Sequence, residues 1–156
     1  MVTVIPHTSN WDFPMGILSR KSIGQDIKFI AKSSLFKWPI GWLFRWLGGY
    51  PVDRSGKHNF VDTIVDIFNQ KETFITTLSP EGTRSKVDKL KTGFYYIAKG
   101  ANIPLVLCRF DWEHKIISFS EPFFTTDDKE ADFKFIDNHF LGIKGKNPEK
   151  GYMYEG

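Results

Sequence analysis

The sequence predicts an α/β fold in which a mostly parallel central sheet is flanked by helices. Short apolar or alternating segments, typical of strands, take turns along the chain with longer segments whose apolar residues recur at helical spacing. A chain of 156 residues with 41% hydrophobic residues is long enough for one sizeable core and too short for two. We therefore expect a single domain over residues 1–141, followed by a C-terminal tail over residues 142–156.

The first two expected strands each end in a polar side chain. Residues 2–5 are apolar and alternating and stop at a proline, which predicts a buried strand with His7 at its end. A helix over residues 13–20 follows. Residues 26–31 then alternate well enough for a second strand, and Lys32 follows that strand directly, before a Ser-Ser turn.

The pair His7 and Asp12 is the first candidate for chemistry. Ser9 or Asn10 is suited to cap the following helix, which places Asp12 in its first turn, where a negative charge is favoured. From there the carboxylate can accept a hydrogen bond from one ring nitrogen of His7 and leave the other nitrogen as a base. A histidine at a strand end also fits a purely structural role, so the pair alone does not assign an activity.

Residues 36–47 predict a helix that carries three tryptophans on one face. Trp38, Trp42 and Trp46 recur at every fourth position, which stacks their indoles along the helix. Two interpretations stay open at this stage. The indoles pack into the core, or they form a face for lipid, because indoles favour the membrane interface.

The next strand and helix bring a second candidate for ligand binding. Residues 49–55 predict a short strand that ends in a polar turn with Arg54, whose planar guanidinium suits a carboxylate or a phosphate. Its neighbour Asp53 fits an ordinary surface ion pair with it equally well. Residues 58–70 carry apolar side chains at helical spacing and predict an amphipathic helix.

A glycine-containing turn follows the fourth expected strand. Residues 73–78 are rich in strand-forming residues and run into residues 79–85, S-P-E-G-T-R-S. Such a turn offers backbone N–H groups together with the guanidinium of Arg84, which are the usual ingredients of a phosphate site. The same composition also suits a plain connection. A helix over residues 91–99 is expected next, and it begins at Lys91.

The last third of the chain predicts strands over residues 103–109 and 115–119 and a helix over residues 127–140. Cys108 is the single cysteine, so an internal disulfide is excluded, and its place in an apolar strand suggests a small buried residue. The tail from Gly142 is rich in Gly, Lys and Pro. We expect this tail to be poorly ordered or docked on a missing partner.

The polar residues that follow the expected strands should share one cleft. His7, Lys32, Arg54 and the turn that holds Glu81 and Arg84 all come directly after strands. In an open, mostly parallel sheet these turns gather at the carboxyl edge, where such folds bind their ligands. The sheet can include one antiparallel edge strand without a change in this arrangement.

Composition and charge exclude several classes of protein. A net charge of +3 and a pI near 8.9 fit anionic ligands or an anionic membrane surface. The basic residues are scattered, so no nucleic-acid partner is expected. No apolar run approaches the length of about 18 residues that a membrane span needs, and no leader with a cleavage site is recognised. We expect a soluble or peripheral protein in a reducing compartment.

Four segments together resemble a known family. His7-Thr-Ser-Asn-Trp-Asp12 resembles the HX4D signature of the PlsC-like glycerolipid acyltransferases, and residues 49–55 resemble the second block of that family. Residues 80–85, P-E-G-T-R-S, match the third block almost letter for letter, and residues 103–106, I-P-L-V, resemble the fourth. The blocks have the family's order and spacing across roughly the first 110 residues, which makes the resemblance specific.

The resemblance implies a single glycerolipid acyltransferase-like domain with a defined activity. An acyl chain would pass from acyl-CoA or acyl carrier protein to a hydroxyl of lysophosphatidate (1-acyl-sn-glycerol 3-phosphate), giving phosphatidate, or of glycerol 3-phosphate. His7 would be the general base and Asp12 its orienting carboxylate, without an acyl-enzyme, a metal or a further cofactor. The implied location is peripheral, at the cytoplasmic inner face of a membrane.

The resemblance also implies a site for the acceptor's phosphate and polar head. It carries over to the following residues: Arg54, Glu81, Gly82, Thr83 and Arg84, with Lys32 and Lys91 as further candidates. The chain departs from the family at Pro6, at Leu78-Ser79 and at Cys108-Arg109, which leaves the acceptor open. The alternatives are an acyltransferase for another lyso-lipid and a catalytically silent module that binds lipid or phosphate.

Overall fold

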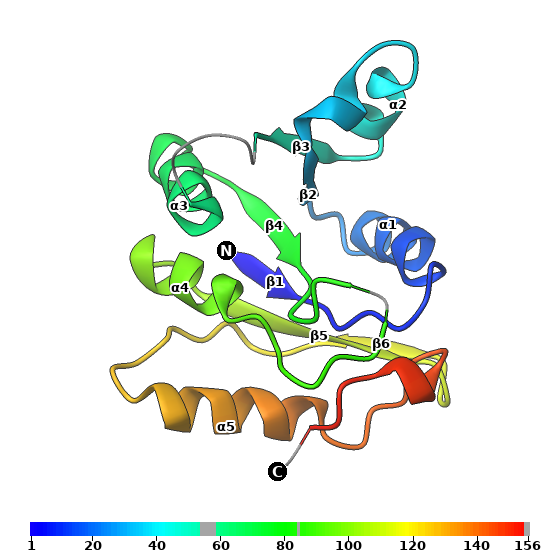
Figure 1. Cartoon of the computed structure of the whole chain (residues 1–156), viewed down its shortest axis with the longest axis vertical. Helices are drawn as coiled ribbons and strands as arrows, with labels where there is room; N and C mark the ends of the chain where they lie inside the picture. The colour runs from blue at the N-terminus through cyan, green and yellow to red at the C-terminus, as the bar shows by residue number, and fades with distance from the viewer. Residues whose placement is uncertain (54–58, 84, 155–156) are drawn as a thin grey trace.

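A six-stranded sheet forms the centre of the computed structural model, which describes residues 1–53, 59–83 and 85–154 (Figure 1). The strand order is β3-β2-β4-β1-β5-β6. The pairings β1–β4, β1–β5, β2–β3 and β2–β4 are parallel, and β5–β6 is antiparallel. The strands are β1 Val2–Val4, β2 Ile27–Lys32, β3 Gly49–Val52, β4 Ile75–Leu78, β5 Leu105–Asp111 and β6 Ile116–Phe119. The predicted fold class is confirmed, including the antiparallel edge.

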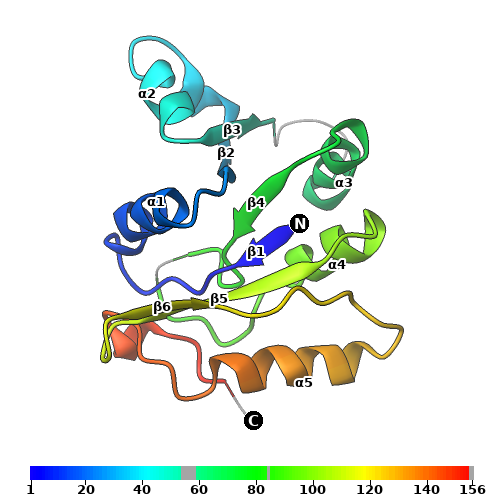
Figure 2. The same cartoon turned by 180° about the vertical axis from the view of Figure 1, so that it is seen from behind.

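The helices cover both faces of this sheet. They are α1 Asp12–Ser22, α2 Gly41–Trp46, α3 Phe60–Gln70, α4 Gly93–Gly100 and α5 Lys129–Phe140, with short 3-10 helices at Ser33–Phe36 (η1) and Pro148–Lys150 (η2). The side chains of α3, α4 and α5 share one core cluster with the central strands, whereas α1 contributes to a second, smaller cluster. Figures 1 and 2 show α1 on the opposite side of β1 and β4 from α3 and α4.

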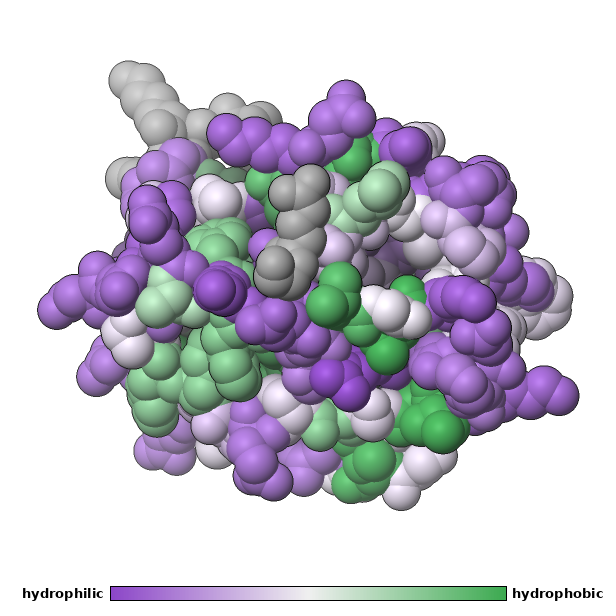
Figure 3. Space-filling view, turned by 90° about the horizontal axis from the view of Figure 1, so that it is seen from below, coloured by the Kyte–Doolittle hydropathy of each residue, from purple (hydrophilic) through white to green (hydrophobic). Residues whose placement is uncertain are grey.

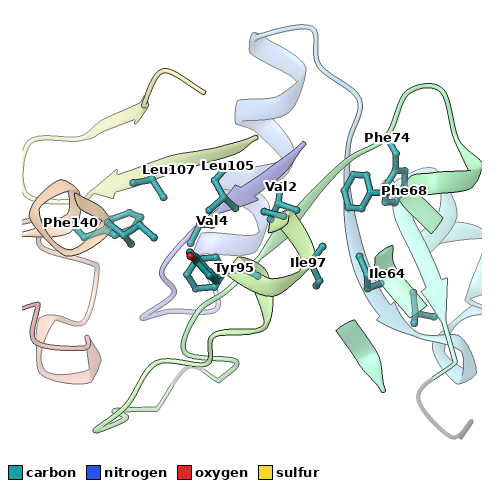
Figure 4. Packing of buried hydrophobic residues seen from close by; sticks show 14 residues of the cluster. Val2, Val4, Ile64, Phe68, Phe74, Tyr95, Ile97, Leu105, Leu107 and Phe140 are labelled. Atoms are coloured by element: carbon teal, nitrogen blue, oxygen red, sulfur yellow. The ribbon is translucent and has the colours of Figure 1, made fainter. Parts of the chain in front are cut away.

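The main core follows from the two-residue period of the central strands. Val2 and Val4 of β1 and Leu105 and Leu107 of β5 are fully buried, and they point toward the same helices (Figure 4). Tyr95 of α4 lies beside them and is also buried. The intervening residues of β5, among them the cysteine, face the smaller cluster. β1 lies in the middle of the sheet and is buried on both faces, which its apolar sequence suits.

The segment between β2 and β3 differs from the expected helix. It contains η1 and the short helix α2, which ends at Trp46 and is followed by Gly48 with a positive φ of 89°. Figures 1 and 2 show α2 beyond the β3 edge of the sheet, apart from the other helices. Trp38, Trp42 and Trp46 are therefore 91%, 68% and 66% exposed. The interpretation that these indoles belong to the core is wrong.

The C-terminal tail also differs from its prediction, because it packs on this chain. Asn147 donates its side-chain N–H to the carbonyl of Thr8 at 2.9 Å and its backbone N–H to the Thr8 hydroxyl at 3.3 Å. Tyr154 packs on Phe140 of α5. The tail is thus neither poorly ordered nor waiting for a missing partner over its described residues 142–154.

The surface formed by α5 and the tail is mostly hydrophilic, with separate hydrophobic patches (Figure 3). Phe124, Phe135 and Leu141 are each about half exposed or more, at 58%, 49% and 51%. Within the part of the chain that the structure describes, no helix combines the length and the apolar character that crossing a membrane requires.

Candidate active site

A cleft of about 1090 Å³ lies at the carboxyl edge of the parallel strands. His7, which directly follows Pro6 after β1, lines it together with Ala31 near the end of β2 and Ser79 after β4. Figure 1 shows the arrowheads of β1 and β4 side by side, and these two strands are paired. The prediction that turns after separate strands share one cleft is confirmed for His7 and for the turn after β4.

One wall of the cleft is apolar. It is built by side chains from α1, β2, η1, α2, α3 and α4: Phe13, Phe29, Ile30, Leu35, Phe44, Phe60 and Phe94. A concave site with an aromatic and aliphatic wall removes a ligand's hydrocarbon from water, while a few polar groups fix its orientation. The polar group best suited to chemistry here is the imidazole of His7, which is half-buried.

The backbone around His7 contacts one of its two ring nitrogens. Nδ1 of His7 lies 3.1 Å from the carbonyl oxygen of Pro6. In the tautomer that carries the proton on Nδ1, this hydrogen bond leaves Nε2 unprotonated and therefore able to accept a proton. The backbone N–H of His7 donates to Oε2 of Glu81 at 3.3 Å. His7 is thus held by its ring contact with the Pro6 carbonyl and by its backbone hydrogen bond to Glu81 in the turn after β4.

Asp12 is buried behind His7 and closes the loop between them. Its Oδ2 accepts the backbone N–H groups of Thr8 and Ser9, each at 2.8 Å, and its Oδ1 accepts the indole N–H of Trp112 at 2.9 Å. The side chain is 2% exposed. Through these bonds Asp12 sets the conformation of the loop that carries His7. A direct hydrogen bond from a ring nitrogen of His7 to Asp12 stays a prediction.

The start of α1 corrects one expectation. The helix begins at Asp12, and the residue at its N-cap is Trp11, whose side chain makes no capping hydrogen bond. Neither Ser9 nor Asn10 is the cap. The physical reason is that the hydroxyl of Ser9 already accepts the N–H of Trp11 at 3.2 Å inside the preceding turn. Asp12 lies in the first helical turn, as predicted.

Glu81 lies behind the loop and not on the cleft. It is 1% exposed and lines a small cavity of about 90 Å³ together with Thr8 and Tyr154. Its Oε2 accepts the hydroxyl of Ser79 at 2.8 Å in addition to the His7 N–H, and Oε1 has no hydrogen-bond partner among the described residues. Burial raises the pKa of Glu81. The structure therefore places this carboxyl where it supports the His7 backbone, apart from the predicted acceptor site.

The other predicted binding residues divide between the cleft and its surroundings. Gly82, Thr83 and Lys91 line the cleft. Gly82 has a φ of 65°, and a Cβ there would lie 2.7 Å from Nζ of Lys91, so glycine allows this close approach. Lys32 is exposed at the end of β2 and is not among the described residues that line the cleft. Two candidates fall outside the described residues: Arg54 and Arg84.

Sequence reasoning missed the residues that hold the loop from behind. Trp112, which donates to Asp12, is separated from it by 100 positions in the sequence, and Asn147 is separated from Thr8 by 139 positions. No local pattern connects such distant residues. An indole directly after a strand and an asparagine in a basic tail are ordinary features of surface turns, so no sequence signal distinguishes them.

Replacement of Glu81 by Gln tests the burial of this carboxyl. Because its folded pKa is raised above the ordinary value of 4.5, the native state binds more protons than the unfolded state above that pH. The contribution of Glu81 to the free energy of unfolding should therefore fall as the pH rises from 4.5 through the raised pKa. Urea unfolding of wild type and E81Q in steps of pH measures this. A difference between them that is independent of pH would contradict the assignment.

Comparison with known proteins agrees with this geometry. The family model described as Acyltransferase matches residues 1–110. The 1-acyl-sn-glycerol-3-phosphate acyltransferase BAT2, chloroplastic, of Brassica napus is 33% identical over 105 residues, and LPAT1, chloroplastic, of Arabidopsis thaliana is 30% identical over 105 residues. Each match covers 64% of this chain and 30% of the relative, so the chain corresponds to under a third of these proteins. No solved structure matches the chain. With the family model covering most of its length and the histidine of the first block at the head of the cleft, this chain belongs to the acyltransferase family.

Proposed function

We propose that this domain transfers an acyl chain from an acyl thioester, on CoA or acyl carrier protein, to a hydroxyl of a glycerol-phosphate acceptor. The observation that carries the proposal is that His7 lines a cleft with an apolar wall. The acceptor that we favour is 1-acyl-sn-glycerol 3-phosphate, which would give phosphatidate, because the two relatives are named for it.

The proposed reaction is a direct transfer. Nε2 of His7 takes the proton of the acceptor hydroxyl while the hydroxyl oxygen attacks the thioester carbonyl. Backbone N–H groups stabilise the negative charge of the tetrahedral intermediate. The C–S bond then breaks, and the imidazolium returns its proton to the departing thiolate. One O–H and one C–S bond are exchanged for one C–O and one S–H bond, so neither a metal nor a further cofactor is needed.

The buried thiol supports a mechanism without an acyl-enzyme. Cys108 of β5 is fully buried in the smaller core cluster, and burial raises its pKa to about 12. A thiol in this state is a poor nucleophile, because the reactive form is the thiolate. Cys108 is also not among the described residues that line the cleft. The acceptor hydroxyl, activated by His7, is therefore the nucleophile that we propose.

The lining residues of the cleft suit the two parts of the substrates. The apolar wall accommodates the acyl chain, and Thr83 and Lys91 offer a hydroxyl and an ammonium to the polar head. We propose that Arg54 and Arg84 contact the acceptor phosphate, on the strength of their places in the second and third family blocks. Arginine suits that role because its planar guanidinium binds phosphate oxygens in pairs.

We further propose that the exposed surface of residues 37–46, which includes α2, binds an anionic membrane surface. The indoles of Trp38, Trp42 and Trp46 are exposed, and the same segment carries the exposed cations Lys37 and Arg45. Indoles enter the lipid interface while cations meet anionic headgroups. The neighbouring side chains Leu35 and Phe44 line the cleft. This geometry supports the proposal of a peripheral enzyme. We propose that it lies at the cytoplasmic inner face of a membrane.

Substitution of the catalytic pair tests the mechanism. His7→Ala removes the base, so turnover in a thiol-release assay with acyl-CoA and lysophosphatidate should fall by about 10²- to 10⁴-fold. Asp12→Asn leaves one acceptor oxygen for three N–H donors, so it should lower both turnover and the free energy of unfolding. Activity of His7→Ala within about tenfold of wild type would contradict the mechanism. Wild-type protein that binds lysophosphatidate without turnover would favour the catalytically silent module.

Neutralising an arginine tests the phosphate site. Arg54→Ala or Arg84→Ala should raise the KM for the acceptor far more than the KM for the thioester. The loss of one charged hydrogen bond should weaken the binding free energy of the acceptor by about 1.5–3 kcal/mol. Lys134→Ala is the matched control, since this lysine is exposed on α5 and is not among the described residues that line the cleft. Equal effects on the two substrates, or an equal effect of the control, would place the arginines elsewhere.

Vesicle binding tests the exposed surface of residues 37–46. Replacement of Trp38, Trp42 and Trp46 by Ser should weaken cosedimentation with vesicles of phosphatidylcholine and phosphatidylglycerol and leave turnover of a short-chain, water-soluble donor intact. A control with three Ser substitutions at exposed apolar side chains elsewhere should bind vesicles like wild type: Ile116, Phe124 and Leu141. Equal binding of both variants would refute a lipid role for this face, and so would a change in oligomeric state instead of vesicle binding.

A further inference from the structure

We propose that Trp112 and Asn147 are positioning residues for the loop from His7 to Asp12, so that residues 142–154, here called the strap, are a working part of the active site. This inference rests on the proposed function for its consequence in catalysis. Its basis is a set of contacts behind the loop. Both residues lie beyond residues 1–110, the part of the chain that the family model matches.

Trp112 connects the buried carboxylate to the strap. It follows β5, and its indole N–H donates to Oδ1 of Asp12 at 2.9 Å. Its backbone N–H donates to the carbonyl of Lys144 in the strap at 3.0 Å. The other oxygen of Asp12 is occupied by the two N–H groups of the loop. Removal of the indole donor would therefore leave a buried carboxylate oxygen without its partner, which loosens the geometry on both sides of it.

Asn147 holds the same loop from its other end. Its side chain and backbone donate to the carbonyl and to the hydroxyl of Thr8, as described above. The N–H of Thr8 donates in turn to Asp12. Gly145 makes this approach possible, because an added Cβ would collide with the hydroxyl of Thr8. Thr8, the residue after the proposed base, is thus bound by the strap on one side and by Asp12 on the other.

A lysine of the strap covers both tryptophans at this junction. Nζ of Lys146 lies 4.5 Å from the ring centroid of Trp11 and 4.9 Å from that of Trp112. An ammonium at these distances is attracted by the faces of both rings. The strap therefore contacts the loop at Thr8, at Trp11 and, through Trp112, at Asp12.

The position of these contacts predicts which kinetic constant they affect. Trp112 lines the small cavity behind the loop, and neither Trp112 nor Asn147 is among the described residues that line the cleft. They do not meet the substrate in this arrangement. Their loss should lower kcat through the orientation of His7, while the KM values for donor and acceptor change little.

The test compares Trp112→Phe and Asn147→Ala with a matched control. Glu113→Ala removes the ion pair between Glu113 and Lys144, 2.7 Å long, which also joins the strap to the β5–β6 turn but does not touch the loop. We expect kcat to fall roughly tenfold or more in the first two variants, with both KM values within about twofold of wild type, and no such change in Glu113→Ala. Loss of kcat in all three variants would assign the effect to general stability.

A double-mutant cycle separates positioning from simple packing. If Trp112 acts through Asp12, then Trp112→Phe should cost much less turnover in an Asp12→Asn background than in wild type. Independent, additive losses in the cycle would refute the coupling. Phenylalanine retains most of the ring's packing, so the comparison isolates the missing N–H donor.

Amide hydrogen exchange tests the strap without any assay of turnover. The N–H groups of Thr8 and Ser9, which Asp12 accepts, should exchange faster in Trp112→Phe and Asn147→Ala than in wild type and Glu113→Ala. Unchanged exchange in both variants would overturn the inference. If wild-type protein transfers no acyl chain to any acceptor, the proposed function fails, and the exchange rates alone decide whether the strap holds the loop.

Discussion

The burial of one carboxylate, that of Asp12, is the constraint on which the candidate active site depends. A buried charge is tolerated only when hydrogen bonds replace the water that it has lost. Two of its three donors are the backbone N–H groups of Thr8 and Ser9, and the third is the indole of Trp112 from the far end of β5. Satisfying this charge folds the loop after β1 into one shape and ties it to the antiparallel edge. The direction in which His7 faces is a consequence of that requirement.

A second buried carboxyl acts on the same histidine from the neighbouring strand. Glu81 follows β4, which pairs with β1, and it accepts the backbone N–H of His7. Burial is the largest cause of its raised pKa, and the charge of Asp12 adds to it. The two acids thus have different environments, because within the described part of the chain Asp12 has three donors and one buried oxygen of Glu81 has no partner. The parallel pairing of β1 and β4 is what brings residues 74 positions apart to one histidine.

Sequence reasoning succeeded where a pattern is local and failed where a contact is distant. Periodicity predicted the strands and every helix except the one expected over residues 36–47, and polar residues at strand ends predicted a shared cleft, because parallel strands present their carboxyl ends on one edge. The same reasoning missed the burial of Glu81, since a Pro-Glu-Gly turn has the composition of an exposed connection. The composition of the tail predicted poor order or docking on a missing partner, yet its Gly145 is the residue that allows close contact with Thr8. The spacing of the three tryptophans left two interpretations open, because this spacing is the same whether the indoles face the core or the solvent.

The excursion between β2 and β3 explains how the proposed lipid face and the cleft belong together. η1 and α2 lie beyond the β3 edge of the sheet (Figure 1). Some of their side chains therefore face the cleft, and others face the solvent. Leu35 and Phe44 line the cleft, whereas Trp38, Trp42 and Trp46 are exposed. A short, protruding segment can therefore be apolar on both sides without burying either side in the core. If the exposed side enters lipid, the cleft opens next to the membrane interface, and an acyl chain reaches the apolar wall near His7 with little hydrocarbon exposed to water.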